Sequence, residues 1–130
     1  MPYTLDDKTI LITGAAQRVG RSLALAVARA GADVLGRKAS LIQADLADPK
    51  AVVRLFEQAV KNGPVYGLVN NASIFESYDW QTTCLEDWNR HLMINLTAPF
   101  LLSQAFARSL PSDMQGRIVN LLDWRSSRPG

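Results

Sequence analysis

The sequence has little of what disulfide or metal chemistry needs. Its 130 residues include one cysteine, Cys84, and one histidine, His91. A single cysteine cannot form an internal disulfide, and a single histidine without nearby thiols gives no cluster with metal-ligand spacing. We therefore expect neither an internal disulfide nor a metal site.

Long apolar runs and runs of like charge are also missing. No apolar stretch approaches the roughly 20 residues of a membrane span, and the N-terminal stretch MPYTLDDKTILITG has acidic residues where a signal peptide has basic ones. The 14 basic and 12 acidic side chains give a formal net charge of +2 and form no basic stripe. These features predict a cytoplasmic protein that binds neither membranes nor nucleic acid.

What the sequence does contain is the composition of a folded domain. Hydrophobic residues make up 48% of the chain and charged residues 20%, which is typical of a globular protein and not of a disordered segment. A chain of this length is expected to fold around one core that buries about two thirds of the surface exposed by the unfolded chain.

Short β-branched runs alternate along the chain with stretches of helical periodicity. The predicted strands are residues 8–13, 32–35, 40–44, 66–70 and 117–122, and the predicted helices are residues 19–30, 50–61 and 85–109. Gly31 is expected to end the first helix. Strands that alternate with helices imply βαβ units, and therefore an α/β fold with a parallel sheet.

The second and third predicted strands lie too close together for this scheme. Only residues 36–39 separate them, whereas a parallel crossover takes about a dozen residues or more. Either the two strands form a hairpin, or a segment near residues 34–36 is absent. The stretch Leu35–Ala39 resembles the tail of a helix and a turn into a strand, which favours absence.

The end of the sequence points the same way. Only eight residues follow the last predicted strand, too few for a helix that would cover that edge of the sheet. We therefore expect residues 1–130 to form a single domain that lacks the segment near 34–36 and also its C-terminal half.

Residues 13–20, TGAAQRVG, link the first predicted strand to the first predicted helix. A strand, a glycine turn and a helix in this order direct free backbone N–H groups and the positive helix end at one point, where a pyrophosphate can bind. Gly14 permits the tight turn and Gly20 permits close packing of the helix on the sheet. The spacing is not G-x-G-x-x-G, so this stretch alone leaves nucleotide binding and an ordinary turn both open.

Further motifs give the sequence a specific resemblance. In chain order they are Thr13-Gly14-x-x-x-Arg18-x-Gly20, Asp45-Leu46, Asn70-Asn71-Ala72-Ser73, Asn95 and Ile118-Val119-Asn120. Together they resemble the short-chain dehydrogenase/reductase family, from about residue 8 to the end, but cover only the front half of such a protein. The resemblance implies a Rossmann-like, doubly wound parallel sheet with helices on both faces, here incomplete.

Three positions resemble the pteridine reductase branch of that family. Arg18 occupies the place of the middle glycine, Ser73 follows Asn-Asn-Ala in place of a glycine, and Asp123 stands where most members have a catalytic serine. This branch implies NADPH as the cofactor and a pterin as the substrate. Phe75 matches the aromatic side chain that stacks on the pterin.

The resemblance also assigns the cofactor contacts. The residues implied are Gly14, Arg18, Val19 and Gly20 near the phosphates, Asp45 and Leu46 around the adenine, and Asn71, Ala72 and Ser73 along the ribose and nicotinamide. Arg18, Ser73 and Phe75 are implied on the substrate side.

The chemistry implied by the family is hydride transfer from the nicotinamide, with a tyrosine that gives the proton and a lysine four residues later. Neither Tyr3, Tyr66 nor Tyr78 has a lysine at that spacing, so the proton donor is missing from this sequence. By motif position, Asp123 orients the tyrosine or relays a proton, and Asn95 bends its helix and holds a water of the proton relay.

Several of these residues are also compatible with a purely structural role. Arg18 is then a solvated arginine at a helix start, and Asn71 and Ser73 only complete the loop backbone. His91 is expected to be structural.

A structural role is open for Asp45, Phe75 and Asp123 as well. Asp45 either caps the helix that follows Pro49 or pairs with Arg37 or Lys38. Phe75 is then a lid over the core, and Asp123 a strand-end carboxylate paired with Arg125 or Arg128.

The substrate and the assembly state remain open at this point. The alternative substrates are a 3-oxoacyl compound or a sugar, reduced at a carbonyl, and the rival class is a catalytically silent nucleotide-binding module. Leu96, Phe100, Leu101 and Phe106 lie at helical spacing, which indicates packing in the core or against another helix. In the family, the equivalent helix packs against a partner subunit. This implies a homo-oligomer, either a dimer or a tetramer.

Overall fold

Three parallel strands form the sheet at the centre of the molecule. The computed structural model describes residues 5–32 and 40–123, and the sheet order is β1 (Thr9–Ile12), β2 (Val65–Asn70), β3 (Arg117–Asn120). Both pairs of strands are parallel, with Ile12 opposite Val69 and Asn70 opposite Asn120. The carboxyl ends of all three strands therefore lie at one edge of the sheet.

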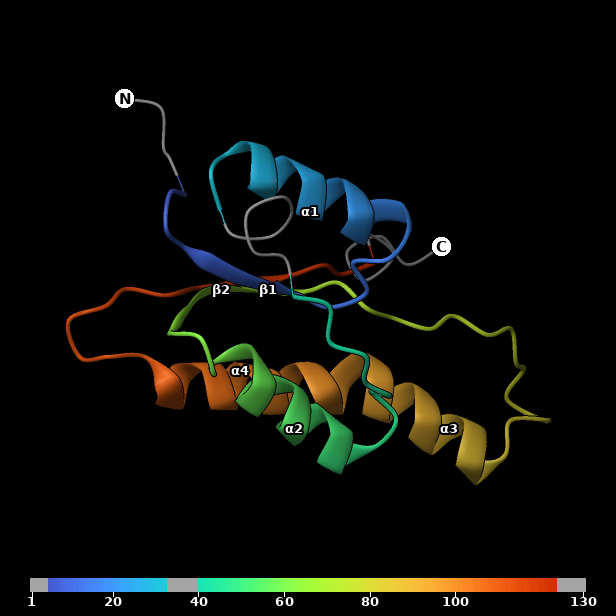
Figure 1. Ribbon diagram of the computed structural model, residues 1–130. Helices are drawn as coiled ribbons and strands as arrows, with labels where there is room; N and C mark the ends of the chain where they lie inside the picture. The colour runs from blue at the N-terminus through green and yellow to red at the C-terminus, as the bar shows by residue number, and fades with distance from the viewer. Residues whose placement is uncertain (1–4, 33–39, 124–130) are drawn as a thin grey trace.

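Helices cover both faces of this sheet. Helix α1 (Arg18–Arg29) lies on one face, and α2 (Pro49–Ala59) and α4 (Ala98–Ser109) lie on the other (Figure 1). Helix α3 (Leu85–Leu92) runs into α4 through a π-helical turn, η1 (Met93–Thr97). This arrangement confirms the predicted Rossmann-like α/β fold.

The ends of α1 and α2 follow from their local sequences. Helix α1 stops at a Schellman motif, in which Gly31, with φ +98°, donates to the Ala28 carbonyl and Ala32 donates to the Val27 carbonyl. Helix α2 starts at Asp48, whose carboxylate accepts a hydrogen bond of 2.9 Å from the N–H of Lys50. The predicted end of the first helix at Gly31 is thus confirmed.

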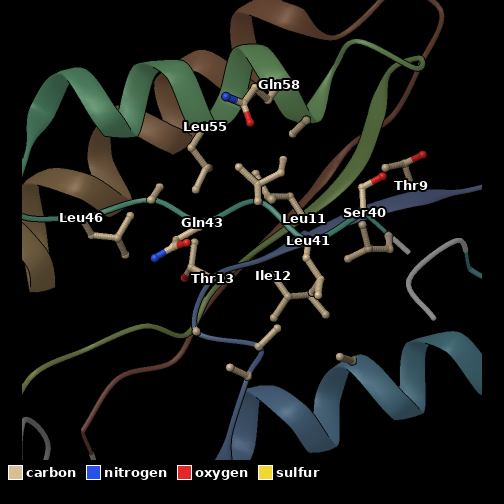
Figure 2. A pocket seen from close by; sticks show the side chains of 18 of the residues that line it. Thr9, Leu11, Ile12, Thr13, Ser40, Leu41, Gln43, Leu46, Leu55 and Gln58 are labelled. Atoms are coloured by element: carbon tan, nitrogen blue, oxygen red, sulfur yellow. The ribbon is translucent and has the colours of Figure 1, made fainter. Parts of the chain in front are cut away.

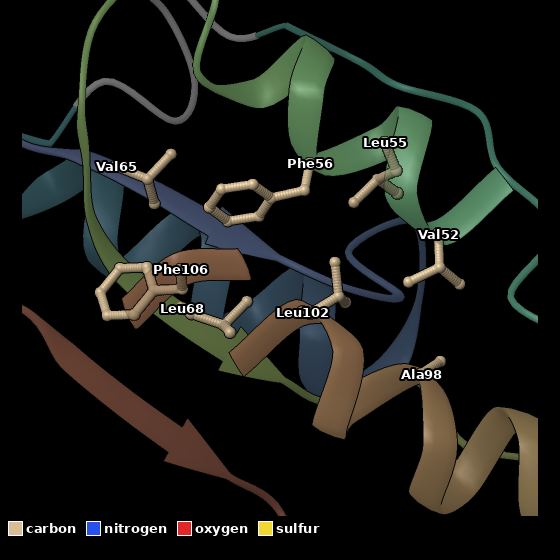
Figure 3. Close-up of a cluster of buried hydrophobic side chains, with 8 residues drawn as sticks. All are labelled: Val52, Leu55, Phe56, Val65, Leu68, Ala98, Leu102 and Phe106. Atoms are coloured by element: carbon tan, nitrogen blue, oxygen red, sulfur yellow. The ribbon is translucent and has the colours of Figure 1, made fainter. Parts of the chain in front are cut away.

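The main core lies between the sheet and the pair α2–α4. Figure 3 shows eight buried side chains that meet there from β2 and these two helices: Val52, Leu55, Phe56, Val65, Leu68, Ala98, Leu102 and Phe106. The face under α1 is thinner, since the buried residues of α1 are Gly20 and Ala24. The core fixes β2 in place, and the loop that follows β2 extends from it toward α3.

One predicted strand is wrong. Residues 40–44 form no strand, although Ile42 and Ala44 alternate with exposed neighbours and pack against the core as a strand would. The alternation is real, but a strand also needs a hydrogen-bonded partner, and β1 pairs only with β2 in the part of the chain that the structure describes. The last strand also ends at Asn120, two residues before its predicted end.

Two further predictions fall partly or wholly outside the described residues. The predicted strand at 32–35 shares only Ala32 with them, and the suspected missing segment near residues 34–36 is not among them. Across the described ranges, none of the helices combines the length and the apolar character that crossing a membrane requires.

Candidate functional site

The carboxyl edge of the sheet gathers three of the predicted groups. Because the strands are parallel, the turn at Gly14 follows β1, the stretch Asn71–Ser73 follows β2, and Asp123 lies three residues beyond β3. In open α/β sheets this edge is where ligands bind.

A buried threonine joins the first two of these loops. Thr13 is 7% exposed, and its Oγ1 accepts hydrogen bonds of 3.0 Å from the backbone N–H groups of both Asn71 and Ala72. The Asn71 side chain in turn donates from Nδ2 to the carbonyl oxygens of Thr13 at 2.9 Å and Gly14 at 3.3 Å. Every one of these contacts crosses from the end of β1 to the loop after β2, so the two loops are fixed to each other.

Gly14 and Gly20 occupy the structural roles predicted for them. Gly14 has φ +66°, in the left-handed region that side chains rarely adopt. A Cβ on Gly20 would collide with the Gly14 carbonyl oxygen and lie against Asn71 Nδ2. The first turn of α1 therefore rests directly on the backbone of the glycine turn.

The start of α1 is open to an anion. Gln17 precedes it with extended backbone and gives it no side-chain cap, and its first turn has no acidic residue. Arg18 and Val19 are exposed there, whereas Gly20 is buried. Uncapped N–H groups and the positive helix end favour a phosphate at this place.

Arg18 itself has an unusual backbone. Its φ is +51°, one of two positive values among the non-glycine residues that the structure describes, the other being Asp7. The left-handed region costs a residue with a Cβ about 1–2 kcal/mol, which explains why a glycine suits this position. An arginine at this position therefore carries a backbone cost that a glycine would not carry. This cost argues against the alternative that Arg18 is only a solvated side chain.

A cavity of ≈ 760 Å³ extends from this turn along the side of β1 that faces away from β2 (Figure 2). Its walls are β1 with the Gly14 turn, the segment 40–44 with Leu46, and Leu55 and Gln58 of α2. Of the two residues assigned to an adenine, Leu46 lines this cavity and Asp45 lies outside its wall.

Asp45 binds backbone N–H groups in the turn that precedes α2. Its carboxylate accepts a hydrogen bond of 2.9 Å from the N–H of Ala47, and its carbonyl accepts one from the N–H of Asp48. The helix cap is Asp48, which also pairs with Arg54 at 3.3 Å. The alternative that Asp45 caps α2 is therefore wrong, and its alternative partners Arg37 and Lys38 lie outside the described residues.

Asn95 lies in η1 and binds the loop after β2. Its Oδ1 accepts from the N–H of Ile74 and its Nδ2 donates to the Ile74 carbonyl, both at 2.9 Å. The π-helical turn agrees with the expected distortion of this helix, and the N–H of Ala98 reaches back five residues to the Met93 carbonyl. Pro99 has no N–H for the Asn95 carbonyl, which removes a regular helical bond at this point.

Ser73, Phe75 and Asp123 are all exposed. Phe75 is 79% exposed, which does not fit the alternative of a lid over the core. The alternative partners of Asp123, Arg125 and Arg128, lie outside the described residues.

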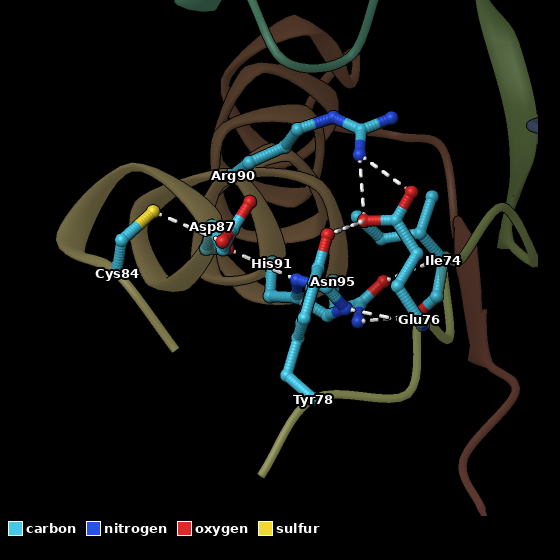
Figure 4. Close-up of polar contacts among 8 residues, drawn as sticks. All are labelled: Ile74, Glu76, Tyr78, Cys84, Asp87, Arg90, His91 and Asn95. Atoms are coloured by element: carbon cyan, nitrogen blue, oxygen red, sulfur yellow. Dashed lines mark hydrogen bonds and ion pairs between the residues drawn. The ribbon is translucent and has the colours of Figure 1, made fainter. Parts of the chain in front are cut away.

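The sequence analysis missed a cluster of polar side chains between this loop and α3 (Figure 4). Arg90 Nη1 lies 2.7 Å from both carboxylate oxygens of Glu76, and the Tyr78 hydroxyl donates to Glu76 Oε2 at 3.1 Å. His91 accepts from the N–H of Glu76 at Nε2 and lies 3.0 Å from the Asp87 carbonyl at Nδ1, which fits the neutral tautomer protonated at Nδ1. The structural role expected for His91 agrees with both contacts.

The contacts of this cluster shift the pKa values of Glu76 and Tyr78 in opposite directions. The hydrogen bond from Arg90 holds the pKa of Glu76 below its usual range. Partial burial, and then the hydrogen bond to Glu76, raise the pKa of Tyr78. The Tyr78 hydroxyl is thus bound to a carboxylate and has no lysine four residues further along the sequence.

In the ranges 5–32 and 40–123, the structure brings no three histidine, cysteine or acidic side chains together as a metal would require. The free thiol of Cys84 is exposed and donates to Asp87 Oδ2 at 2.9 Å.

Known proteins with similar sequences include reductases and dehydrogenases. The family model for short chain dehydrogenases matches residues 34–123. The chain is 30% identical to the L-xylulose reductase of Caenorhabditis elegans over 147 aligned positions, which cover 98% of the chain and 58% of that protein. It is 31% identical to the 5-keto-D-gluconate 5-reductase of Escherichia coli (strain K12), over 95% of the chain and 57% of that protein. The chain thus spans a little over half the length of these curated relatives.

Solved structures with a similar fold include two that contain NADPH or NADP. A blue fluorescent protein from a metagenomic library, crystallised with NADPH, superimposes with a TM-score of 0.89 at 35% identity, over 98% of the chain and 60% of that protein. The FolM alternative dihydrofolate reductase 1 from Brucella canis, complexed with NADP, gives a TM-score of 0.90 at 27% identity, over 100% of the chain and 60% of that protein.

The contact between α1 and the glycine turn predicts the effect of a methyl group at residue 20. Glycine to alanine within a helix normally stabilises a protein by about 1 kcal/mol. For Gly20→Ala we expect the opposite, a loss of at least about 2 kcal/mol in the free energy of unfolding, because the methyl meets backbone atoms that cannot rotate away. Urea unfolding followed by circular dichroism measures it.

The matched control is Ser22→Ala, on an exposed position of the same helix. It is expected to change the free energy of unfolding by less than about 0.5 kcal/mol. A Gly20→Ala protein as stable as this control would show that α1 does not rest on the Gly14 turn.

Proposed function

Because the chain belongs to the short-chain dehydrogenase family, we propose that it is the nucleotide-binding part of an NADPH-dependent reductase. One observation carries this proposal: the uncapped start of α1 lies on the Gly14 turn through Gly20, in a contact that leaves no room for a side chain. Such a close approach of helix and turn is what a bound pyrophosphate requires. The NADPH and NADP in the two similar structures support the choice of cofactor.

The residues present fit this cofactor. Gly14, Arg18, Val19 and Gly20 are proposed to hold the pyrophosphate, with Arg18 supplying a cation and planar donors. Leu46 is proposed to pack on the adenine from the wall of the cavity, with Asp45 beside it. Asn71, Ala72 and Ser73 are proposed to lie along the ribose and nicotinamide. The bound cofactor would supply a hydride, and these residues bind and orient it.

The proposed substrate is the carbonyl group of a small sugar derivative. The curated relatives include an L-xylulose reductase and a 5-keto-D-gluconate 5-reductase, which support a carbonyl substrate over other classes. Asn95 and Asp123 are proposed to serve the proton relay at the same edge of the sheet. No tyrosine of the sequence is followed four positions later by a lysine. The proton donor is therefore proposed to belong to a region equivalent to the part of the relatives that lies outside the match.

The relatives' length also bears on the suspected missing segment. The alignment with the L-xylulose reductase runs over 147 positions although the chain has only 130 residues. The relative thus carries residues within the matched range that this chain lacks. This supports the proposal that residues 1–130 are one NADP-binding domain without a segment near 34–36 and without the C-terminal catalytic half.

A second candidate substrate is a pterin. The observation that favours it is Arg18, which is kept in a left-handed backbone where a glycine would be unstrained. Phe75 offers an exposed aromatic face for a flat heterocycle. The similar structure of an alternative dihydrofolate reductase supports this branch, at 27% identity.

We also propose a homo-oligomer, either a dimer or a tetramer, built on the long helix. Large apolar side chains recur every three or four residues along its exposed face: Leu85, Trp88, Leu92, Leu96 and Phe100. An apolar stripe of this kind on a helix favours a partner surface. Leu101 and Phe106 pack in or against the core, which is the other packing mode predicted for these residues.

The first test of function is a cofactor titration of Arg18→Gly. We expect NADPH to bind the native chain more tightly than NADH, and the substitution to weaken NADPH binding about tenfold, since a charge-assisted contact is lost. The same substitution should raise the free energy of unfolding by up to about 1 kcal/mol, because φ is +51° at this residue. Quenching of tryptophan fluorescence and urea unfolding measure the two effects.

Arg21→Gly is the control for this pair of measurements. Arg21 is exposed one turn further along α1, where glycine should lower the stability by about 1 kcal/mol and leave NADPH binding unchanged. The proposed role of Arg18 fails if Arg18→Gly binds NADPH as the native chain does.

The second test separates the two substrates. With NADP bound, we expect 5-keto-D-gluconate to bind the native chain more tightly than dihydrofolate does, as measured by calorimetry. Arg18→Gly should weaken dihydrofolate binding more than 5-keto-D-gluconate binding if the pterin is the natural substrate. An equal loss for both compounds would remove the reason for the pterin branch.

The third test concerns the oligomer. Leu96→Glu places a charge in the middle of the apolar stripe, where Leu96 is 63% exposed, and should shift the assembly to monomers in sedimentation velocity. Leu41→Glu, in the wall of the cavity and outside this stripe, changes a side chain that is 94% exposed and should leave the assembly unchanged. A native chain that sediments as a monomer at every concentration would contradict the proposal.

A further inference from the structure

Two residues of the loop after β2 are held by one face of the long helix. The Asn95 side chain binds both backbone groups of Ile74 at 2.9 Å. His91 Nε2 accepts the N–H of Glu76 at 3.3 Å. His91 and Asn95 are four residues apart, hence on one helix face, and the residues that they hold are two apart. The helix therefore binds the loop on either side of Phe75.

The second of these contacts is itself supported. Arg90 Nη1 contacts both carboxylate oxygens of Glu76 at 2.7 Å, and Tyr78 donates to the same carboxylate. The His91 ring is fixed by the Asp87 carbonyl at 3.0 Å and by the edge of Tyr78, with 5.6 Å between ring centroids. Figure 4 shows Arg90 and His91 of α3 and Asn95 of η1 beside Ile74, Glu76 and Tyr78 of the loop.

An isolated surface ion pair would be a weak basis for a role, since most contribute little to stability. Here three side chains, those of Arg90, His91 and Tyr78, act on the backbone and carboxylate of one residue, Glu76. Residues 71–79 have no regular secondary structure to order them. These contacts therefore decide how the loop is placed.

We propose that Arg90 and His91 are positioning residues, which hold Phe75 as a preformed aromatic platform on the substrate side of the cofactor. Phe75 is 79% exposed between the two residues that the helix binds, and it lies three residues beyond Ala72, so that their Cα atoms are within about 10 Å of each other. A side chain ordered before binding costs less entropy when a ligand stacks on it. The ligand is a small substrate with a flat or apolar face, and this part of the proposal rests on the proposed function.

The first experiment needs no ligand. The full chain is labelled with 4-fluorophenylalanine, which marks its four phenylalanines, and Phe75→Leu assigns the signal of Phe75. His91→Phe keeps a ring beside Tyr78 but removes the acceptor for Glu76, and the fifth labelled ring that it adds is distinguished from Phe75 by Phe75→Leu in the same background. His91→Gln keeps an acceptor. We expect the Phe75 signal to shift and its fluorine relaxation to slow toward that of a mobile side chain in His91→Phe and Arg90→Gln. His91→Gln should restore it.

Arg108→Gln is the matched control, because Arg108 is an exposed arginine on α4. It should leave the Phe75 signal as in the native chain, and the signals of buried Phe56 and Phe106 should be unchanged in all variants. A Phe75 signal that is the same in His91→Phe, Arg90→Gln and the native chain overturns the positioning role.

The second experiment separates this proposal from the proposed function. With NADP bound, His91→Phe should weaken binding of 5-keto-D-gluconate or dihydrofolate about three- to tenfold, and should leave the affinity for NADPH within about twofold. Equal losses for NADPH and the substrate probe, or no loss for either probe, overturn the platform. Absence of NADPH binding by the native chain would instead overturn the proposed function, while the fluorine measurement still decides the positioning role.

Discussion

The hydroxyl of Thr13 is the contact on which the rest of the site depends. Buried at the end of β1, it accepts two backbone N–H groups from the loop after β2, and a valine would leave both without partners at about 1–3 kcal/mol each. Asn71 Nδ2 holds the Gly14 carbonyl from the same loop, and Gly20 packs against both groups. The position of the first turn of α1 therefore depends on the loop after β2. The strained backbone of Arg18 follows, because the chain must turn from the glycine loop into the helix within a few residues.

Much of the fold could be predicted from the sequence because its elements are locally consistent. Gly31 ends α1 through its own left-handed backbone, and the apolar period of residues 50–61 appears as α2. The strand predicted at 40–44 failed for a non-local reason: alternation shows which side chains are buried, but it does not supply a neighbouring strand. Asp45 failed as a cap because Asp48 stands directly before Pro49, and proline is a common first residue of a helix.

The candidate site divides in the same way. The glycine turn and Asn71 are recognisable because their spacing is short and their chemistry is specific. The contacts of Glu76 with Arg90 and His91 join residues 14 and 15 positions apart, across a loop with no periodic pattern. The one available signal was the i, i+4 spacing of His91 and Asn95, which places them on one face but does not name their partners.

The long helix from Leu85 to Ser109 packs in the core, binds the loop after β2 and carries the exposed apolar stripe. Leu102 and Phe106 enter the core, whereas Leu96 and Phe100 stay on the exposed face. Pro99 lacks the N–H that would continue the regular ladder, and the π-helical turn just before it holds Asn95. The turn that interrupts the helix therefore coincides with the residue that binds the loop. Core, loop and exposed stripe are connected through this one helix, so its sequence has to satisfy all three at once.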